Sequence, residues 1–153
     1  MKHLAKVILC TAITATAASP SFASEPFEDQ IEARQAFFQV VKFNMGTLGA
    51  MVKGKRDYDP AVAEAAAKDI YSLTMLNNSL MWPAGSDNSA TDETKAKPEF
   101  WTESADVMEK HSAWNKAAEQ LAADAGKGLD QLKASFGPVG KSCKSCHDNY
   151  KAK

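Results

Sequence analysis

The feature that most limits how this chain can fold is a Cys-x-x-Cys-His motif, formed by Cys143, Cys146 and His147 close to the last residue. Two thiols three positions apart can form thioether bonds to the two vinyl groups of one haem, and the adjacent imidazole then binds the iron from one side. The motif predicts one covalently attached haem c per chain, with His147 as the metal ligand. Only six residues follow His147, so we expect any group on the other face of the haem to come from upstream.

The other chemical uses of such a motif have little support in the sequence. A structural zinc site needs four ligands, and the remaining cysteine and histidines are Cys10, His3 and His111. A redox-active pair of the thioredoxin kind lies within a βαβ pattern, and no segment here reads as a strand. Haem attachment is therefore the interpretation that the residues favour.

Residues 1–23 have the features of a secretory signal that is cleaved on export. Lys2 and Lys6 give a positive start, an apolar or small-residue run extends from Val7 to Ala18, and Ser21-Phe22-Ala23 fits a small-x-small cleavage site. The apolar run is too short to span a bilayer. These features predict a cleaved signal peptide and a periplasmic protein that has no membrane partner.

The mature chain is then expected to comprise residues 24–153, a length that favours one domain. Removing residues 1–23 takes away two of the 18 basic residues and none of the 19 acidic residues, so the net charge changes from −1 to −3. This charge gives no support for nucleic-acid binding. The mature chain keeps two cysteines, both used by the predicted haem, so no disulfide is expected.

Four stretches place apolar residues at alternating three- and four-residue spacings, the pattern of amphipathic α-helices. They predict an all-α, antiparallel four-helix bundle whose facing side chains enclose a cofactor. Pro83 to Lys97 is polar and rich in turn-forming residues, which predicts a solvated loop. Pro138 predicts a kink or a brief break within the last stretch. The four stretches run from Pro26 to Gly54, Asp59 to Trp82, Pro98 to Ala125 and Leu129 to Tyr150.

One charged residue, Arg34, lies on the predicted inward row of the first stretch. Burying a guanidinium without an anion is costly, and a haem propionate suits a bidentate arginine. We therefore expect Arg34 to bind a haem propionate, the alternative being a surface ion pair.

In the second stretch the predicted inward row ends at Leu76 and Leu80. The predicted row of the first stretch is Phe27, Ile31, Arg34, Phe38, Val41, Met45, Leu48 and Val52.

Several of these features together resemble the cytochrome c′ family. The resemblance covers essentially the whole mature chain, and it is carried by the Arg34-Gln35 pair, by Trp101 and by the block from Val139 to Lys151. It implies a high-spin haem iron bound by the motif histidine alone, with an apolar distal pocket built by the first helix. It also implies binding of NO and CO. Gln35 is then expected near the haem edge and Trp101 against the porphyrin.

The residues about one helical turn beyond Arg34 separate two branches of this fold. Low-spin relatives have a methionine there, whereas this chain has Phe37 and Phe38. A phenyl ring cannot ligate iron, so we expect a five-coordinate haem capped by Phe38, with Phe37 as the other candidate. The alternative is a six-coordinate electron-transfer cytochrome with Met45 as the distal ligand. Met45 lies seven residues after Phe38, roughly 10.5 Å along the helix, which favours core packing over ligation.

The expected distal face carries no acid–base residue, which favours capture of a gas, with NO as the expected ligand, over enzyme catalysis. The redox partner cannot be identified from the sequence. Members of the resembled family form homodimers through the first two helices. Val40, Phe43 and Leu48 would leave apolar surface for such an interface here.

Overall fold

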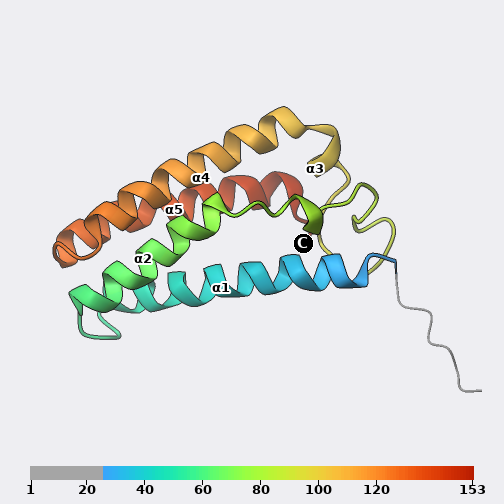
Figure 1. Ribbon diagram of the computed structural model, residues 1–153. Coiled ribbons are helices and arrows are strands. Elements are labelled where there is room, and N and C mark those ends of the chain that lie inside the picture. The colour runs from blue at the N-terminus through green and yellow to red at the C-terminus, as the bar shows by residue number, and fades with distance from the viewer. Residues whose placement is uncertain (1–25) are drawn as a thin grey trace, which may run out of the picture.

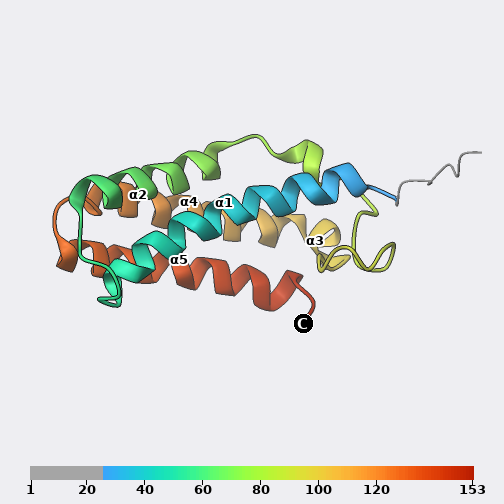
Figure 2. The ribbon, with the colours of Figure 1, turned by 90° about the horizontal axis from the view of Figure 1, so that it is seen from below.

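The computed structural model describes residues 26–153, and the predicted signal at 1–23 lies outside the described residues. Four long helices form an antiparallel bundle, as the sequence predicts (Figures 1 and 2). Within the described residues, the one β-type pairing is an isolated antiparallel bridge between Ala96 and Lys151. None of the helices in this part of the chain has the length and apolar character of a membrane span. The helices are α1 (Glu28–Val52), α2 (Pro60–Met75), the 3₁₀ turn η1 (Ser79–Met81), α3 (Glu99–Thr102), α4 (Ser104–Asp124) and α5 (Leu129–Tyr150).

Short connections close one end of the bundle, which we call the far end. Asp59 caps α2 by accepting the N–H groups of Ala61 and Val62 at 2.9 and 3.0 Å, and Pro60 occupies the first helical position. The hydroxyl of Tyr58 donates to the carbonyl of Ala125 at 2.8 Å and accepts the amide of Gly128 at 2.9 Å. The turn between α1 and α2 is thereby bound to the turn between α4 and α5.

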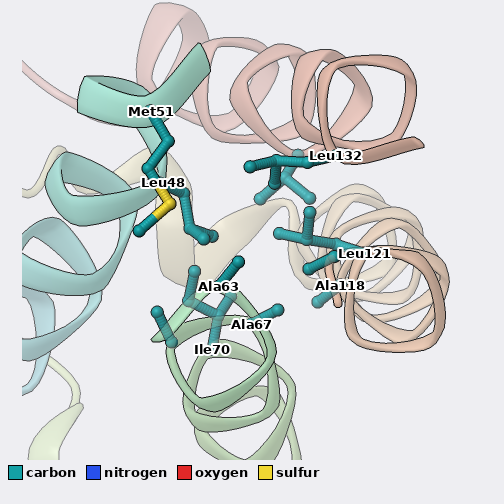
Figure 3. Packing of buried hydrophobic residues seen from close by; sticks show 11 residues of the cluster. Leu48, Met51, Ala63, Ala67, Ile70, Ala118, Leu121 and Leu132 are labelled. Atoms are coloured by element: carbon teal, nitrogen blue, oxygen red, sulfur yellow. The ribbon is translucent and has the colours of Figure 1, made fainter. Parts of the chain in front are cut away.

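The hydrophobic core fills the half of the bundle nearest the far end. It takes residues from the end of α1, the start of α2, the end of α4 and the start of α5, and these side chains point toward one another (Figure 3). Small residues in α2 and α4 allow the two helices to pack closely. The labelled members are Leu48, Met51, Ala63, Ala67, Ile70, Ala118, Leu121 and Leu132.

Helix α2 ends earlier than the sequence pattern predicts. Leu76 is extended, with φ −67° and ψ 129°, and Leu80 is 89% exposed. The side chain of Asn77 accepts hydrogen bonds from the amide and hydroxyl of Ser79 at 3.2 and 2.9 Å. Such a local bond competes with the helical one, so the apolar spacing does not carry the helix beyond Met75.

The third predicted helix is divided at Glu103, which has φ −108° and ψ 42° and separates α3 from α4. The division leaves Phe100 stacked on Trp82, with ring centroids 4.3 Å apart. Conversely, the expected break at Pro138 is absent, because α5 continues through that residue. Ala134 and Pro138 are both exposed, so water can bind the carbonyl that loses its helical donor.

Candidate haem site

The Cys-x-x-Cys-His motif lies in the last two turns of α5. Cys143 and Cys146 are three residues apart on a helix, so both thiols lie on one side of it, and each is half-buried. Cys143 packs against the core, while His147 is more exposed. A helix that holds two free thiols one turn apart, beside an imidazole, matches the donor set for thioether attachment of one haem.

The surroundings of the motif shift the ionisation of its side chains. Burial raises the pKa of both thiols, and the nearby ammonium of Lys110 partly opposes this for the pKa of Cys146. Desolvation, followed by the positive charge of Lys151, lowers the pKa of His147. The neutral imidazole is the form that binds iron, so the environment of His147 favours the ligating state.

The end of the bundle that carries the motif, which we call the haem end, has large apolar side chains that are exposed. Leu80 lies in η1, which contacts α1, and the ring of Phe38 lies 6.4 Å from that of Trp82. The sulfur of Met75 accepts a hydrogen bond from Asn115 of α4 at 3.1 Å. Covering such surface is favourable, and a haem is a large apolar body. The exposed fractions are 41% for Phe38, 66% for Met75, 49% for Leu76, 89% for Leu80 and 72% for Met108.

A second observation at this end also fits a haem. The indole nitrogen of Trp114 is buried and has no hydrogen-bond partner among the described residues. Its ring meets those of Phe37 and His111, with centroids 6.4 and 5.8 Å away. A buried donor without a partner costs free energy, so this part of the interior is incomplete when only the polypeptide is counted. The residues present therefore fit the cofactor that the motif predicts.

Arg34 is 3% exposed; Nη1 donates a long bond to the carbonyl of Met81 in η1 at 3.5 Å, and the closer partners of Arg34 come from the loop that follows η1. Nη2 donates to the carbonyl of Ser86 at 2.5 Å and to the hydroxyl of Thr94 at 2.7 Å, while Nη1 donates to the hydroxyl of Ser86 at 2.7 Å. Burial lowers the pKa of Arg34, and Asp87 opposes this shift. Gln35 donates to the carbonyl of Glu93 at 2.7 Å. The roles of Arg34 at a propionate and Gln35 at the haem edge stay predictions.

The first helix turns Phe37, not Phe38, toward the core. Phe37 is 6% exposed and Phe38 is 41% exposed, so among protein atoms Phe37 takes the core-facing position, and the choice of Phe38 as the distal cap stays a prediction. The two rings meet edge to face, with their centroids 5.1 Å apart. Met45, the alternative ligand, is partly buried against the core cluster. The buried residues of α1 are Ile31, Arg34, Phe37, Val41, Asn44, Leu48, Gly49 and Met51.

Trp101 belongs to an aromatic cluster that the sequence pattern did not reveal. Its indole N–H donates to the carbonyl of Trp82 at 3.1 Å, and its ring lies 5.1 Å from that of Phe100. Phe100 in turn meets Tyr150, three residues after the motif histidine, at 6.2 Å. The adjacent aromatics at 100 and 101 were the only sequence signal. Contact of Trp101 with the porphyrin stays a prediction.

Two further side chains, His111 and Phe136, are not placed as ligands. His111 is exposed. Phe136 packs beside Gly49 in the core, where a Cβ built on Gly49 would lie 3.3 Å from the ring. Within residues 26–153, no three His, Cys, Asp or Glu side chains gather as a metal site of protein ligands would need.

Comparisons with known proteins agree with the site. The sequence profile of the family described as cytochrome C′ matches residues 29–151. Cytochrome c′ of Cereibacter sphaeroides is 35% identical over 148 residues, which cover 97% of this chain and 98% of that protein. The solved cytochrome c′ of Rhodobacter sphaeroides gives a TM-score of 0.81 at 36% identity, covering 84% of this chain and 98% of that one. The corresponding values for Shewanella frigidimarina cytochrome c′ are 0.74, 37%, 85% and 99%. The chain therefore belongs to the cytochrome c′ family and is a monohaem c-type cytochrome that carries one covalent haem c in a four-helix bundle.

Proposed function

We propose that this cytochrome is a periplasmic gas-binding protein whose five-coordinate, high-spin haem captures NO and also binds CO. One observation carries the proposal: the turn of α1 that follows Arg34 offers two phenyl rings, Phe37 and Phe38, and no side chain that can ligate iron. The adjacent Phe37–Phe38 and Phe38–Trp82 contacts make this turn apolar. A gas can therefore reach the iron without displacing a protein ligand.

Each residue of the site has a distinct part in this function. Cys143 and Cys146 would hold the haem on α5, and the neutral imidazole of His147 would bind its iron. When bound, the haem supplies the iron atom that takes the gas. The phenyl rings on the other side exclude water, but they neither donate nor accept a proton. Trapping of the gas is therefore favoured over its enzymatic conversion.

Solved relatives support gas binding as a property within the family. A variant of the Alcaligenes xylosoxidans cytochrome c′ is known with NO bound in the ferrous state, at 34% identity and a TM-score of 0.71 to this chain. Another variant of that protein is known with carbon monoxide bound, at 32% identity and a TM-score of 0.72. The proposal extends this chemistry to the present chain.

The second candidate function is electron transfer by a six-coordinate, low-spin haem with Met45 as distal ligand. The packing of Met45 against the core cluster argues against this candidate. Absorption spectra of the purified holoprotein, oxidised and reduced, decide between the two. We expect high-spin spectra in both states and stoichiometric uptake of NO and CO by the ferrous protein. A low-spin spectrum of the reduced protein before gas is added would reject the five-coordinate site.

We also propose that the protein is a homodimer in which α1 forms part of the interface. Val40 and Phe43 are 48% and 73% exposed, and a shallow depression lined partly by Phe43 and Gly46 follows this face. Leu48, which the sequence placed on the same surface, is fully buried instead. One solved cytochrome c′, 33% identical to this chain, has an unusual ligand-controlled dimer dissociation. Sedimentation at micromolar concentration should give twice the monomer mass, and Phe43→Glu should give the monomer.

Export is tested separately from gas binding. We expect the haem-containing protein in the periplasmic fraction, with residue 24 at its N-terminus. A mature protein that keeps residues 1–23 would contradict the proposed signal cleavage.

A further inference from the structure

The side chain of Arg34 fastens both ends of one loop to α1. Its guanidinium binds Ser86, near the start of the loop at 83–98, through both the carbonyl and the hydroxyl, and it binds Thr94 near the end of that loop. The ring of Trp82 lies beneath it, with the guanidinium carbon 4.9 Å from the ring centroid. Gln35 adds a bond to the carbonyl of Glu93. A segment that the sequence presents as a solvated loop is therefore held against α1 by buried bonds.

The same loop is bound to the end of α5, directly after the haem motif. The amide of Lys97 donates to the carbonyl of Tyr150 at 3.0 Å, and the amide of Ala152 donates to the carbonyl of Lys95 at 2.8 Å. These bonds surround the antiparallel bridge between Ala96 and Lys151. The C-terminus accordingly lies at the haem end of the bundle, beside this loop (Figure 1).

The loop thus connects the two helices that present opposite faces of the haem. Arg34 lies one turn before Phe38 on α1, and Tyr150 lies three residues after His147 on α5. The direct packing of α1 against α5 is less extensive than its packing against α2. The bonds through the loop are therefore an important link between the distal side chains and the haem-bearing turn.

We propose that Arg34 is a positioning residue for gas entry, which acts through Ser86 and Thr94 by fixing the separation between α1 and the end of α5. The proposal rests on the gas-binding function proposed above. When the hydroxyl groups of Ser86 and Thr94 are removed, Arg34 keeps its bonds to the carbonyls of Ser86 and Met81, but its bond to the end of the loop at Thr94 is lost. The attachment of the loop is thereby weakened. Helix α1 then moves more freely away from α5, and Phe38 obstructs the path to the iron less.

The test uses the holoprotein carrying Ser86→Ala together with Thr94→Val, so that Arg34 and the haem remain in place. Thr91→Val is the matched control, because that hydroxyl accepts only from the amide of Glu93 within the loop. We measure CO association with the ferrous protein by flash photolysis and hydrogen exchange at the amides of Lys97 and Ala152. The double variant should bind CO about tenfold faster and exchange both amides about tenfold faster. Thr91→Val should behave as the wild type.

Conservative changes separate the loop from a direct action on the haem. Thr94→Ser keeps the hydroxyl and should keep the wild-type rates, whereas Arg34→Lys cannot bridge Ser86 and Thr94 and should resemble the double variant. Wild-type rates in a folded, haem-loaded double variant would overturn the proposal. So would a large effect of Arg34→Gln that the double variant does not reproduce, since Arg34 would then act directly on the haem. If the wild type binds no CO, the proposed function fails, and the two amides alone still show whether Arg34 fixes the loop to α5.

Discussion

The hydroxyl of Tyr150 lies 2.9 Å from a carboxylate oxygen of Glu103, so the helix that carries the haem motif is bonded to the residue that separates α3 from α4. Tyr150 is 4% exposed, and its hydroxyl also contacts Asp106. The hydrogen bond to Asp106, followed by burial and the bond to Glu103, raises the pKa of Tyr150. The folded chain therefore favours the protonated phenol.

This pKa shift predicts how stability depends on alkaline pH. Because the folded state holds the phenol proton more tightly than the unfolded state, the contribution of Tyr150 is complete below the unfolded pKa of about 10. This contribution is lost as the pH rises above that value. Tyr150→Phe should lower the melting temperature by about 5 °C at pH 7. The melting temperature of this variant should also fall less steeply above pH 10 than that of the wild type. Thermal melts monitored by circular dichroism test this, with Tyr71→Phe as the control.

Haem attachment should depend on both thiols of the motif. Cys143→Ala or Cys146→Ala should leave at most one thioether bond, because each thiol binds one vinyl group. The double variant should lose its haem on acid–acetone extraction, whereas the wild-type haem stays with the chain. Absorbance of the precipitated protein measures the difference. Retention of haem by the double variant would reject covalent attachment through these cysteines.

The identity of the distal cap is tested by comparing the two neighbouring phenylalanines. Phe38 is the more exposed ring and is predicted to cover the iron, so Phe38→Ala should speed CO association by about tenfold, equivalent to about 1.4 kcal/mol in the barrier. Phe37→Ala should instead lower stability by about 3 kcal/mol or more, because it leaves a cavity in the interior. Flash photolysis and urea unfolding measure the two effects. A rate change confined to Phe37→Ala would exchange the two assignments.

The far end of the bundle should control stability without affecting the haem. Tyr58→Phe removes the hydroxyl that joins Ala125 to Gly128 and should cost about 1–3 kcal/mol. Gly128→Ala should also destabilise, since φ is 144° there and a Cβ would lie 2.7 Å from the side chain of Gln131. Urea unfolding measures both, while the absorption spectrum and the CO rate should stay at wild-type values. A changed spectrum in Tyr58→Phe would show that the two ends are coupled.

Much of the bundle could be predicted because its signals are local. Asp59-Pro60 marks the start of α2, Gly54 follows the end of α1, and the spacing from Leu129 to Tyr150 matches α5. The early end of α2 and the division of the third predicted helix both lie toward the haem end, where tertiary and side-chain bonds override apolar spacing. Asn77 ends α2 early through its own bond to Ser79.

The candidate site divides in the same way. The residue types and spacing of Cys143, Cys146 and His147 are by themselves enough to predict haem attachment, so this part of the site can be recognised without a structure. The loop partners of Arg34, Ser86 and Thr94, lie 52 and 60 residues further along the chain, and no local pattern reports such a pairing. The choice between Phe37 and Phe38 depends on helix rotation, which a row of apolar spacings does not define to within one residue.

The placement of the core at the far end separates folding from function along the length of one small domain. The half that holds Leu121 and Leu132 is closed by protein atoms alone, so its packing does not need contacts from a cofactor. The other half is free to keep an unfinished interior and to exchange its distal side chains during evolution. Changes to side chains at the haem end can therefore alter the cofactor's surroundings while the far end keeps the four helices together.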